Sequence, residues 1–325
     1  MKREITGKVV KGLGGLYEVL CRNEDGAFVR YTCRAMGKLR RAGASGGSAV
    51  AEKEDKLLIG DTVTITQDTE MPDDLAISSI AERRNALIRP PLANLDVLLV
   101  VFAAATPAPA PETIDKLLAI AEYHRIEPVI VVTKCDLDRA EADRLVALYR
   151  GAGFPVFQTC VPTGEGVSPL AAYLETLLRG GKTAAFAGAS GVGKSTLINA
   201  VLPGVCMQTG DLSRRIERGK HTTRRVEIFP IRENEPDAGY LCDTPGFSQL
   251  DFVRFDFFTL EDLESTFRDI APYRGKCRYA DCTHVGEGAE ECAVSRAANE
   301  GKIAASRLDS YRTLYRILKE KKQYK

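Results

Sequence analysis

The sequence predicts a multidomain protein with an N-terminal β-barrel, a central α/β domain and a mainly helical C-terminal domain that holds a metal ion. Three observations predict it: short strand-like runs at the start, apolar strands alternating with amphipathic helices in the middle, and a cysteine-histidine cluster near the end. A chain of 325 residues, 44% of them hydrophobic, is long enough for two or three separate cores. We expect domains at 1–75, 95–254 and 255–325, with a linker at 76–94.

The N-terminal segment alternates short β-branched and aromatic runs with turn residues. The runs are ITGKVV, LYEVL, FVRYTCRA and DTVTITQD, and a glycine-rich basic loop, RRAGASGGSAV, lies among them. Several short strands in so small a segment are typical of an antiparallel barrel, because closure removes exposed strand edges. The basic loop is typical of the nucleic-acid face of an OB-fold. We therefore predict an OB-like barrel that binds RNA.

The central segment alternates two kinds of pattern. LDVLLVVFAA, PVIVVTK, FPVFQTC and TAAFAGAS are apolar and β-branched, whereas Ile114, Leu117, Leu118 and Ala121 recur at helical spacing. This alternation predicts a parallel sheet covered by helices on both faces. Two later runs, RRVEIFPI and GYLCDTPG, are expected to complete the sheet.

A formal net charge of +1 hides an uneven distribution of charge. Residues 26–51 carry five basic residues and no acid, and residues 301–325 carry eight basic residues against two acids. Such runs favour a polyanionic partner, with a solvated surface as the alternative for each. No apolar run approaches the length of a membrane span, and the N-terminus lacks a secretory signal. We expect a cytoplasmic protein without a membrane partner.

The segment GASGVGKS has the spacing of a phosphate-binding loop, and it lies between a strand-like run and a helical one. Glycines let the backbone wrap around phosphate groups, whose charge the helix N-terminus attracts. Lys194 is expected to reach the β- and γ-phosphates, and the Ser195 hydroxyl to bind Mg²⁺. The nucleotide-binding residues expected here are Gly188, Ala189, Ser190, Gly191, Val192, Gly193, Lys194, Ser195 and Thr196.

Two further segments carry the chemistry of a nucleotide switch. In DTPG, Asp243 can hold magnesium through water and Gly246 can donate its N–H to a γ-phosphate, although this tetrapeptide is also ordinary turn chemistry. The polar loop RRIERGKHTTRR offers Thr222 or Thr223 as the hydroxyl that closes on Mg²⁺ when the γ-phosphate is present. The residues alone do not choose between the two threonines.

The tetrapeptide TKCD, which ends the run PVIVV, is expected to read the base. The carboxylate of Asp136 can accept two hydrogen bonds from guanine that adenine cannot match, and an unpaired buried carboxylate rejects adenine. Lys134 is expected to pack its stem along the nucleotide, and Thr133 precedes it. In the weaker motif QTCVPTGEG, a backbone N–H around Cys160 or Val161 is expected to donate to the guanine O6.

The chain contains nine cysteines, and three of them cluster with one of its three histidines. The spacing Cys277-x₄-Cys282-x-His284-x₇-Cys292 supplies three thiolates and one imidazole, which is the closed shell of a structural Zn²⁺ site. Buried thiols without a metal are the alternative. The other cysteines are scattered, as in a reduced cytosolic protein. Beyond the cluster, Tyr311, Leu314, Tyr315 and Leu318 predict a helix that faces the core and leaves its basic residues outside.

Together these motifs resemble the ribosome small-subunit-dependent GTPase A (RsgA) family of circularly permuted GTPases. The resemblance rests on the order TKxD, GxxxxGKS, GKHTTR and DTPGF, on the OB-like start and on PYRGKCRYADCTH, and it covers essentially the whole chain. It implies a GTP hydrolase with Mg²⁺ that cycles between GTP and GDP. It also implies that the chain binds 16S rRNA in the small ribosomal subunit late in maturation and leaves after hydrolysis. We expect a monomer.

The resemblance to this family also favours some residue roles and shows where this sequence departs from related GTPases. Alignment with it favours Thr223 as the magnesium ligand, and VGEGAEE looks like an insertion in the metal loop. Thr133 stands where many GTPases have Asn, and Phe247 stands where Ras-like enzymes place the Gln that orients water. We therefore expect slow intrinsic hydrolysis that the ribosome accelerates, with His221 as the candidate catalytic group and a surface histidine as its alternative.

Two other functions remain open from the residues. An ATP-dependent phosphate-loop kinase would need ATP selectivity, against which Asp136 argues. A non-catalytic, zinc-containing RNA-binding module would hold nucleotide without turning it over. In the permuted order, the second switch runs almost directly into the C-terminal domain, so that a shift of that loop would reorient the domain.

Overall fold

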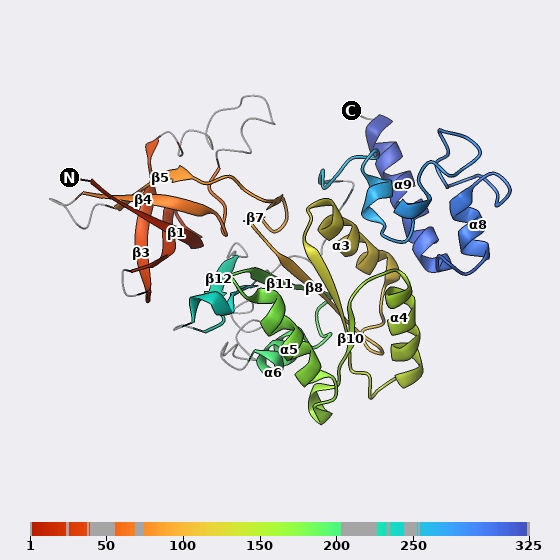
Figure 1. Cartoon of the computed structure of the whole chain (residues 1–325), viewed down its shortest axis with the longest axis horizontal. Helices are drawn as coiled ribbons and strands as arrows, with labels where there is room; N and C mark the ends of the chain where they lie inside the picture. The colour runs from red at the N-terminus through yellow and green to blue at the C-terminus, as the bar shows by residue number, and fades with distance from the viewer. Residues whose placement is uncertain are drawn as a thin grey trace. The chain divides into compact units, whose positions relative to one another are not determined.

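The structure is a computed structural model of the chain (Figure 1). It describes residues 2–23, 26–37, 39, 56–68, 75–202, 226–232, 235–243, 252 and 254–323. The chain divides into two compact units. The first unit comprises 1–95, 175–185 and 210–246, and the second comprises 96–174, 186–209 and 247–325.

Five strands close a barrel in the order β1-β2-β3-β5-β4, which confirms the predicted OB-like barrel. Strands β3 and β5 pair in parallel, and the other neighbours pair antiparallel. Alternate side chains fill the interior, where Val9, Val19, Val63, Ile65 and Ile77 are at most 1% exposed. The strand bounds are Lys2–Leu13, Leu16–Arg22, Phe28–Ala35, Thr62–Asp68 and Leu75–Ile80 for β1 to β5.

The first four strands coincide with the four predicted runs, whereas β5 was not predicted. Strand β5 carries barrel pairing beyond residue 75, into the segment that was expected to be a linker. The sequence LAISSI has a weak apolar pattern, and Ile77 becomes a core residue only because β5 completes the closure.

The segment that follows the barrel is itself held by buried polar contacts. The carboxylate of Asp61, fully buried, forms a two-pronged ion pair with Arg83, at 2.7 and 2.9 Å. The amide of Asn94 donates to the Gly60 carbonyl at 3.1 Å. A short ribbon of β6 (Ala86–Leu87) and β7 (Leu92–Ala93) lies between these contacts. The segment is therefore a fixed extension of the barrel.

A six-stranded sheet in the order β10-β9-β8-β11-β13-β12 forms the α/β part of the chain (Figure 1). The strands are β8 (Val97–Ala103), β9 (Glu127–Thr133), β10 (Val156–Gln158), β11 (Thr183–Ala187), β12 (Glu227–Pro230) and β13 (Tyr240–Asp243). The edge strand β12 runs antiparallel to β13, which corrects the expected all-parallel sheet. Strand β12 ends at Pro230 and β13 begins at Tyr240, so the connection between them is short. A parallel pair would need a crossover of about a dozen residues or more, whereas an antiparallel pair does not.

Within the described residues, four helices connect these strands: α3 (Pro111–Tyr123), α4 (Arg139–Gly151), α5 (Val167–Leu178) and α6 (Lys194–Val201). Helix α3 buries Ile114, Leu117, Leu118 and Ala121, as their spacing predicted. Strands β8 and β11 are buried at every position, which is typical of central strands.

The C-terminal segment is built from short 3₁₀ turns and two helices. The turns are η3 (Leu263–Thr266) and η4 (Ala271–Tyr273), and the helices are α8 (Ala293–Asn299) and α9 (Ala305–Gln323). Tyr311, Leu314 and Leu318 are buried, as predicted, whereas Tyr315 is only half-buried. No helix in the described ranges is both long and apolar enough to cross a membrane.

The prediction that α9 leaves its basic residues outside is wrong for Arg307. Its side chain is 1% exposed and donates to Asp115 at 2.7 Å and to both carboxylate oxygens of Asp269 at 2.8 and 3.1 Å. The guanidinium also lies 4.6 Å from the Phe267 ring centre and 5.5 Å from that of Phe154. The ion pair between Arg307 and Asp115 attaches α9 to α3. Removing the cation would destabilise the protein, because two carboxylates would remain buried without a counter-charge.

Other basic side chains near the C-terminus are also held within the chain. The Lys321 ammonium donates to the carbonyls of Phe252 and Phe255 at 2.9 and 2.7 Å. Lys322 pairs with Glu261, and Arg312 donates to the His284 carbonyl at 3.1 Å. The basic run is therefore partly structural and leaves a smaller surface for a polyanion than its charge count indicates.

Candidate functional site

The phosphate-loop segment lies between β11 and α6, where three glycines adopt positive φ. Gly188 has φ of 151°, and a Cβ added there would lie 2.0 Å from the Val101 carbonyl oxygen. Gly191 and Gly193 have φ of 81° and 94°, which other residues adopt only with strain. The glycines thus permit a tight loop that approaches the neighbouring strand β8.

Lys194 begins α6 and curls back over the loop. Its ammonium donates to the carbonyls of Gly188 and Ala189, both at 2.7 Å, and burial lowers the pKa of this lysine. The first N–H groups of α6 have no partner within the helix, and they and the positive end of its dipole lie at the same loop. These groups form an arrangement suited to a polyphosphate.

The end of β9 contacts this loop directly, although the two motifs are far apart in the sequence. The Thr133 hydroxyl, on a residue 4% exposed, lies 2.6 Å from the Val192 carbonyl and 3.2 Å from that of Phe102. The Lys134 ammonium donates to the carbonyls of Gly191 and Thr106 at 2.8 and 2.7 Å. The structure therefore brings the predicted base-reading segment against the predicted phosphate loop.

Lys134 adopts φ of 55°, and this turn carries the exposed Asp136 beyond the strand. The Arg139 guanidinium pairs with Glu165 at 2.7 Å, linking the Asp136 segment to the loop after β10. The Cys135 N–H also donates to the Thr159 carbonyl at 3.4 Å. Neither Arg139 nor Glu165 was predicted, because no sequence signal pairs two exposed charges on different loops.

In the loop after β10, the backbone N–H groups of Cys160 and Val161 have different surroundings. The Cys160 N–H donates to the Glu165 carbonyl at 2.9 Å, whereas Val161 is the first residue of the 3₁₀ turn η1 (Val161–Thr163). A first helical residue has no acceptor for its N–H within the helix. Gly166 closes the loop at φ of 71°, and a Cβ there would lie 1.8 Å from the Gln158 carbonyl oxygen.

Some of the remaining predicted residues of this site lie within the described residues, and others lie outside them. Ala189 and Ser190 lie exposed in the loop, and Ser195 and Thr196 lie in the first turn of α6. Asp243 is the last residue of β13, and its side chain is outside the described part. Also outside the described residues are His221, Thr222, Thr223, Gly246 and Phe247.

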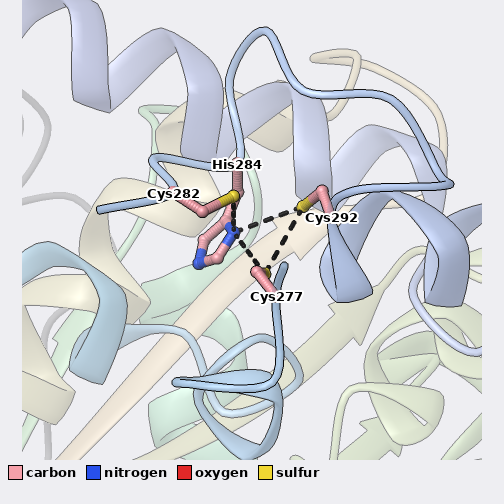
Figure 2. A group of neighbouring side chains, drawn as sticks. All are labelled: Cys277, Cys282, His284 and Cys292. Carbon is pink, nitrogen blue, oxygen red and sulfur yellow. Dashed lines mark hydrogen bonds between the residues drawn. The ribbon is translucent and has the colours of Figure 1, made fainter. Parts of the chain in front are cut away.

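The predicted metal ligands converge on one point in the C-terminal segment (Figure 2). The Nδ1 atom of His284 lies 3.5, 3.4 and 3.3 Å from the sulfurs of Cys277, Cys282 and Cys292. The sulfurs of Cys277 and Cys292 are 3.9 Å apart, and all four ligand atoms lie within 4.8 Å of one another. His284 adopts φ of 61°, which turns its ring into the cluster.

These separations fit a tetrahedral Zn²⁺ site. Bonds of about 2.3 Å to sulfur and about 2.0 Å to nitrogen place two ligand sulfurs about 3.8 Å apart and sulfur about 3.5 Å from nitrogen. Three sulfurs and one nitrogen complete the shell, so the chemistry of such a site is structural.

A second layer of groups orients the ligands. The other ring nitrogen of His284 lies 3.4 Å from a carboxylate oxygen of Glu264, an arrangement that selects Nδ1 as the metal-facing atom. The backbone N–H of Ser295 donates to the Cys292 sulfur at 3.3 Å. Burial opposes ionisation of Cys292, but this N–H and the neighbouring His284 and Cys282 lower its pKa to about 7.

Glu287 organises the segment that looked like an insertion. Its carboxylate accepts from the N–H groups of Thr283, Val285 and Gly286, each at 3.1 Å. Burial would raise the pKa of Glu287, yet these donors lower it. Its backbone carbonyl accepts from the Ser295 hydroxyl at 2.9 Å. The carboxylate thus closes the loop between two ligands, a role that its spacing alone did not reveal.

The chain matches known proteins over nearly its full length. A family model described as RsgA GTPase matches residues 80–253. The small ribosomal subunit biogenesis GTPases RsgA of Agathobacter rectalis and Alkaliphilus metalliredigens are 37% and 39% identical to it, each covering 98% of this chain and 100% and 99% of the relative.

Two solved structures share the fold. YloQ, described as a circularly permuted GTPase, has a TM-score of 0.71 and 31% identity, over 99% of this chain and 96% of its own. YjeQ from Thermotoga maritima has a TM-score of 0.74 and 30% identity, over 97% of this chain and 99% of its own.

Proposed function

The chain belongs to the RsgA GTPase family, and from that premise we propose that it acts in the biogenesis of the small ribosomal subunit. The chain is a GTPase with a circularly permuted fold. In the proposed cycle the GTP-bound protein binds 16S rRNA on the immature subunit, and hydrolysis releases it with GDP. The relatives named as small ribosomal subunit biogenesis GTPases each cover 98% of this chain, which supports the proposal.

The contact between the base-reading segment and the phosphate loop carries the proposal for the nucleotide site. Thr133 and Lys134 hold the end of β9 against Val192 and Gly191, as one nucleotide spanning both segments requires. In this site Asp136 reads guanine and the N–H of Val161, rather than that of Cys160, donates to the guanine O6.

The groups around the phosphates have distinct proposed roles. Lys194 exchanges its two carbonyl acceptors for the β- and γ-phosphates, while Ser195 and Thr223 bind Mg²⁺. The cofactor supplies charge neutralisation on the phosphates when bound. Asp243 would help to hold the Mg²⁺, and the N–H of Gly246 would donate to the γ-phosphate. The other loop residues, Gly188 to Gly193 and Thr196, contribute backbone contacts.

We further propose that intrinsic hydrolysis is slow and that the small ribosomal subunit stimulates it. Phe247 cannot orient water, so His221 is the proposed catalytic group. The C-terminal cluster holds one structural Zn²⁺, and the protein is a cytoplasmic monomer. Its proposed domains are 1–75, extended through β5 to Ile80, then 95–254 and 255–325. Neither a kinase nor a non-catalytic module is supported by the family.

The test is release of inorganic phosphate from GTP or ATP, with and without purified small subunits. We expect GTP selectivity and a rate that rises strongly with subunits. Asp136→Asn should lower affinity for GTP and relax selection against ATP, whereas Asp138→Asn, at the N-cap of α4, is the matched control. Unchanged purine preference in Asp136→Asn would refute the assigned base-reading residue.

A further inference from the structure

Two lysines of the barrel strand β1 contact β11, β12 and β13 within the first compact unit. The Lys11 ammonium lies 3.1 Å from a carboxylate oxygen of Glu227, the first residue of β12. The Lys8 ammonium donates to the Thr183 hydroxyl at 2.9 Å and lies 4.0 Å from the centre of the Tyr240 ring. Because β12 and β13 are antiparallel, the two lysines contact opposite ends of this strand pair.

A bulge in β1 places both lysines on the side of that strand pair. In a regular strand, residues three positions apart project to opposite faces. The pairing of β1 with β2 shifts between Val9 and Lys11, where two steps along β1 correspond to one step along β2. Such a bulge reverses the alternation of faces beyond it, and Val9 and Val10 are accordingly both fully buried. Lys8 and Lys11 therefore reach the same neighbouring strands.

The Lys11 contact lies where two acidic residues oppose each other. Glu227 and Asp243 are register partners in the antiparallel pair of β12 and β13. Directly opposed residues of such a pair lie within about 5.5 Å at their Cα atoms, and like charges at these positions destabilise the pairing. Lys11 offsets the charge of Glu227. The strand pairing at Asp243 thus includes a cation that the barrel supplies.

This ion pair is less solvated than another charged contact of the barrel. The side chains of Lys11 and Glu227 are 33% and 27% exposed. Arg22 pairs with Asp237 at 2.9 Å, but these side chains are 48% and 77% exposed. Asp237 lies in the 3₁₀ turn η2 (Pro236–Ala238), between β12 and β13. Because water screens exposed pairs, Lys11 should affect the strand pair more than Arg22 does.

We propose that Lys11 is a positioning residue of the nucleotide site, which neutralises Glu227 and so keeps Asp243 paired at the end of β13. Lys11 touches no nucleotide and acts through Glu227 on the backbone that carries Asp243. This role rests on the proposed function, in which Asp243 helps to hold Mg²⁺, a cation that prefers oxygen ligands. The barrel thus contributes to the nucleotide site, although it carries none of the nucleotide-binding motifs.

The first measurement is amide hydrogen exchange in the full-length protein without nucleotide or Mg²⁺, with β8 as the internal reference. Lys11→Ala should accelerate exchange in residues 227–230 and 240–243 by up to about fivefold, the effect of one cross-strand charge pair. Lys11→Arg should exchange as the parent does, because the charge is kept. Lys11→Ala/Glu227→Gln should also return to the parent rate, because the opposed like charges are gone.

The second measurement is the affinity for GTP with and without Mg²⁺, by titration calorimetry. Lys11→Ala should reduce the gain in affinity that Mg²⁺ gives by up to about fivefold, and it should leave the affinity without Mg²⁺ unchanged. A general loss of stability would not confine the loss to the magnesium-dependent part. Arg22→Ala is the matched control, because it removes a paired barrel cation and leaves the contact between Lys11 and Glu227 in place.

Unchanged exchange in β12 and β13, or an unchanged gain from Mg²⁺, in Lys11→Ala would overturn the positioning role. So would a double variant as impaired as Lys11→Ala, since Lys11 would then only attach the barrel. Equal losses in Arg22→Ala would have the same meaning. Phosphate release from GTP by the parent protein with small subunits tests the proposed function separately, and the exchange measurement stands whatever that assay gives.

Discussion

The nucleotide-binding loops and the metal loop both place converging polar groups on irregular backbone, but different forces hold them. The phosphate loop depends on glycines and on hydrogen bonds from Thr133 and Lys134, which arrive from another strand. The metal loop draws its four ligands from sixteen consecutive residues, Cys277 to Cys292, with Glu287 closing the turn between them. The first site is therefore assembled by the fold, whereas the second is assembled by local sequence and, as we propose, by a metal ion.

The largest effect should come from removing the metal. Cys282→Ser, or a zinc chelator, is expected to abolish cooperative folding of the C-terminal segment, because binding of a structural zinc contributes about 10–16 kcal/mol in small domains. The measurement is zinc content together with differential scanning calorimetry. Cys21→Ser, in the barrel core, is the control for a cysteine outside the cluster. An unchanged thermogram in metal-free protein would show that the C-terminal segment folds without a metal ion.

The buried ion triad provides the next effect. Arg307→Met should destabilise the protein by about 3–5 kcal/mol, because Asp115 and Asp269 would remain buried without their cation. Chemical denaturation measures the change. The triple variant Arg307→Met/Asp115→Asn/Asp269→Asn should recover much of the lost stability, because all three buried charges are removed at once. A single variant as stable as the parent would contradict the assigned role of the triad.

Removal of the Thr133 hydroxyl should have an intermediate effect. Thr133→Val keeps the shape but leaves the Val192 carbonyl without its donor, which costs about 1–3 kcal/mol for a buried group. We expect weaker binding of GTP and GDP alike, with the preference for guanine over adenine nucleotides unchanged. Titration calorimetry measures both. Thr133→Ser is the control, and an altered base preference in Thr133→Val would show that the hydroxyl reads the base.

The next largest effect is expected from a substitution in the loop after β10, which is proposed to lie beside the base. Gly166→Ala places a methyl group against the Gln158 carbonyl at φ of 71°, and such backbone strain costs about 1–3 kcal/mol. Guanine nucleotide affinity should fall, whereas Gly164→Ala, where a Cβ meets open space at a similar φ, should fall less. Equal losses in the two variants would show that the close approach at Gly166 is unimportant.

The smallest effect should come from the exposed pair between Arg139 and Glu165. Exposed ion pairs contribute little because water screens them, so Arg139→Ala should change GTP affinity only slightly. The difference should shrink further at high salt. Arg232→Ala removes a comparably exposed guanidinium, which lies 3.6 Å from Glu175, and serves as control. A loss that persists in high salt would place Arg139 in contact with the nucleotide.

The local motifs were predictable because their spacing reflects the chemistry directly. The turn of the phosphate loop needs Gly188 and Gly193 at fixed positions, and a closed zinc shell needs its four ligands within a short span. The barrel and the α/β sheet followed from residue patterns in the same way.

The missed features depend on distant partners. Arg307 looked like any other basic residue of a helix, and only the fold places it beside Asp115 and Asp269. Strand β5 has no strong pattern of its own, and the direction of β12 follows from its short return to β13. For the same reason the C-terminal basic run could not be divided into surface and structural charges from sequence alone.

The contact between Arg307 and Asp115 also has a temporal consequence, because the two residues are separated by 192 positions. A chain made from its N-terminus exposes Asp115 long before the cation that neutralises it emerges. Helix α3 can therefore bury Asp115 beside its counter-charge only after α9 has been made. A translation product that stops before α9 has no Arg307 to neutralise the Asp115 carboxylate.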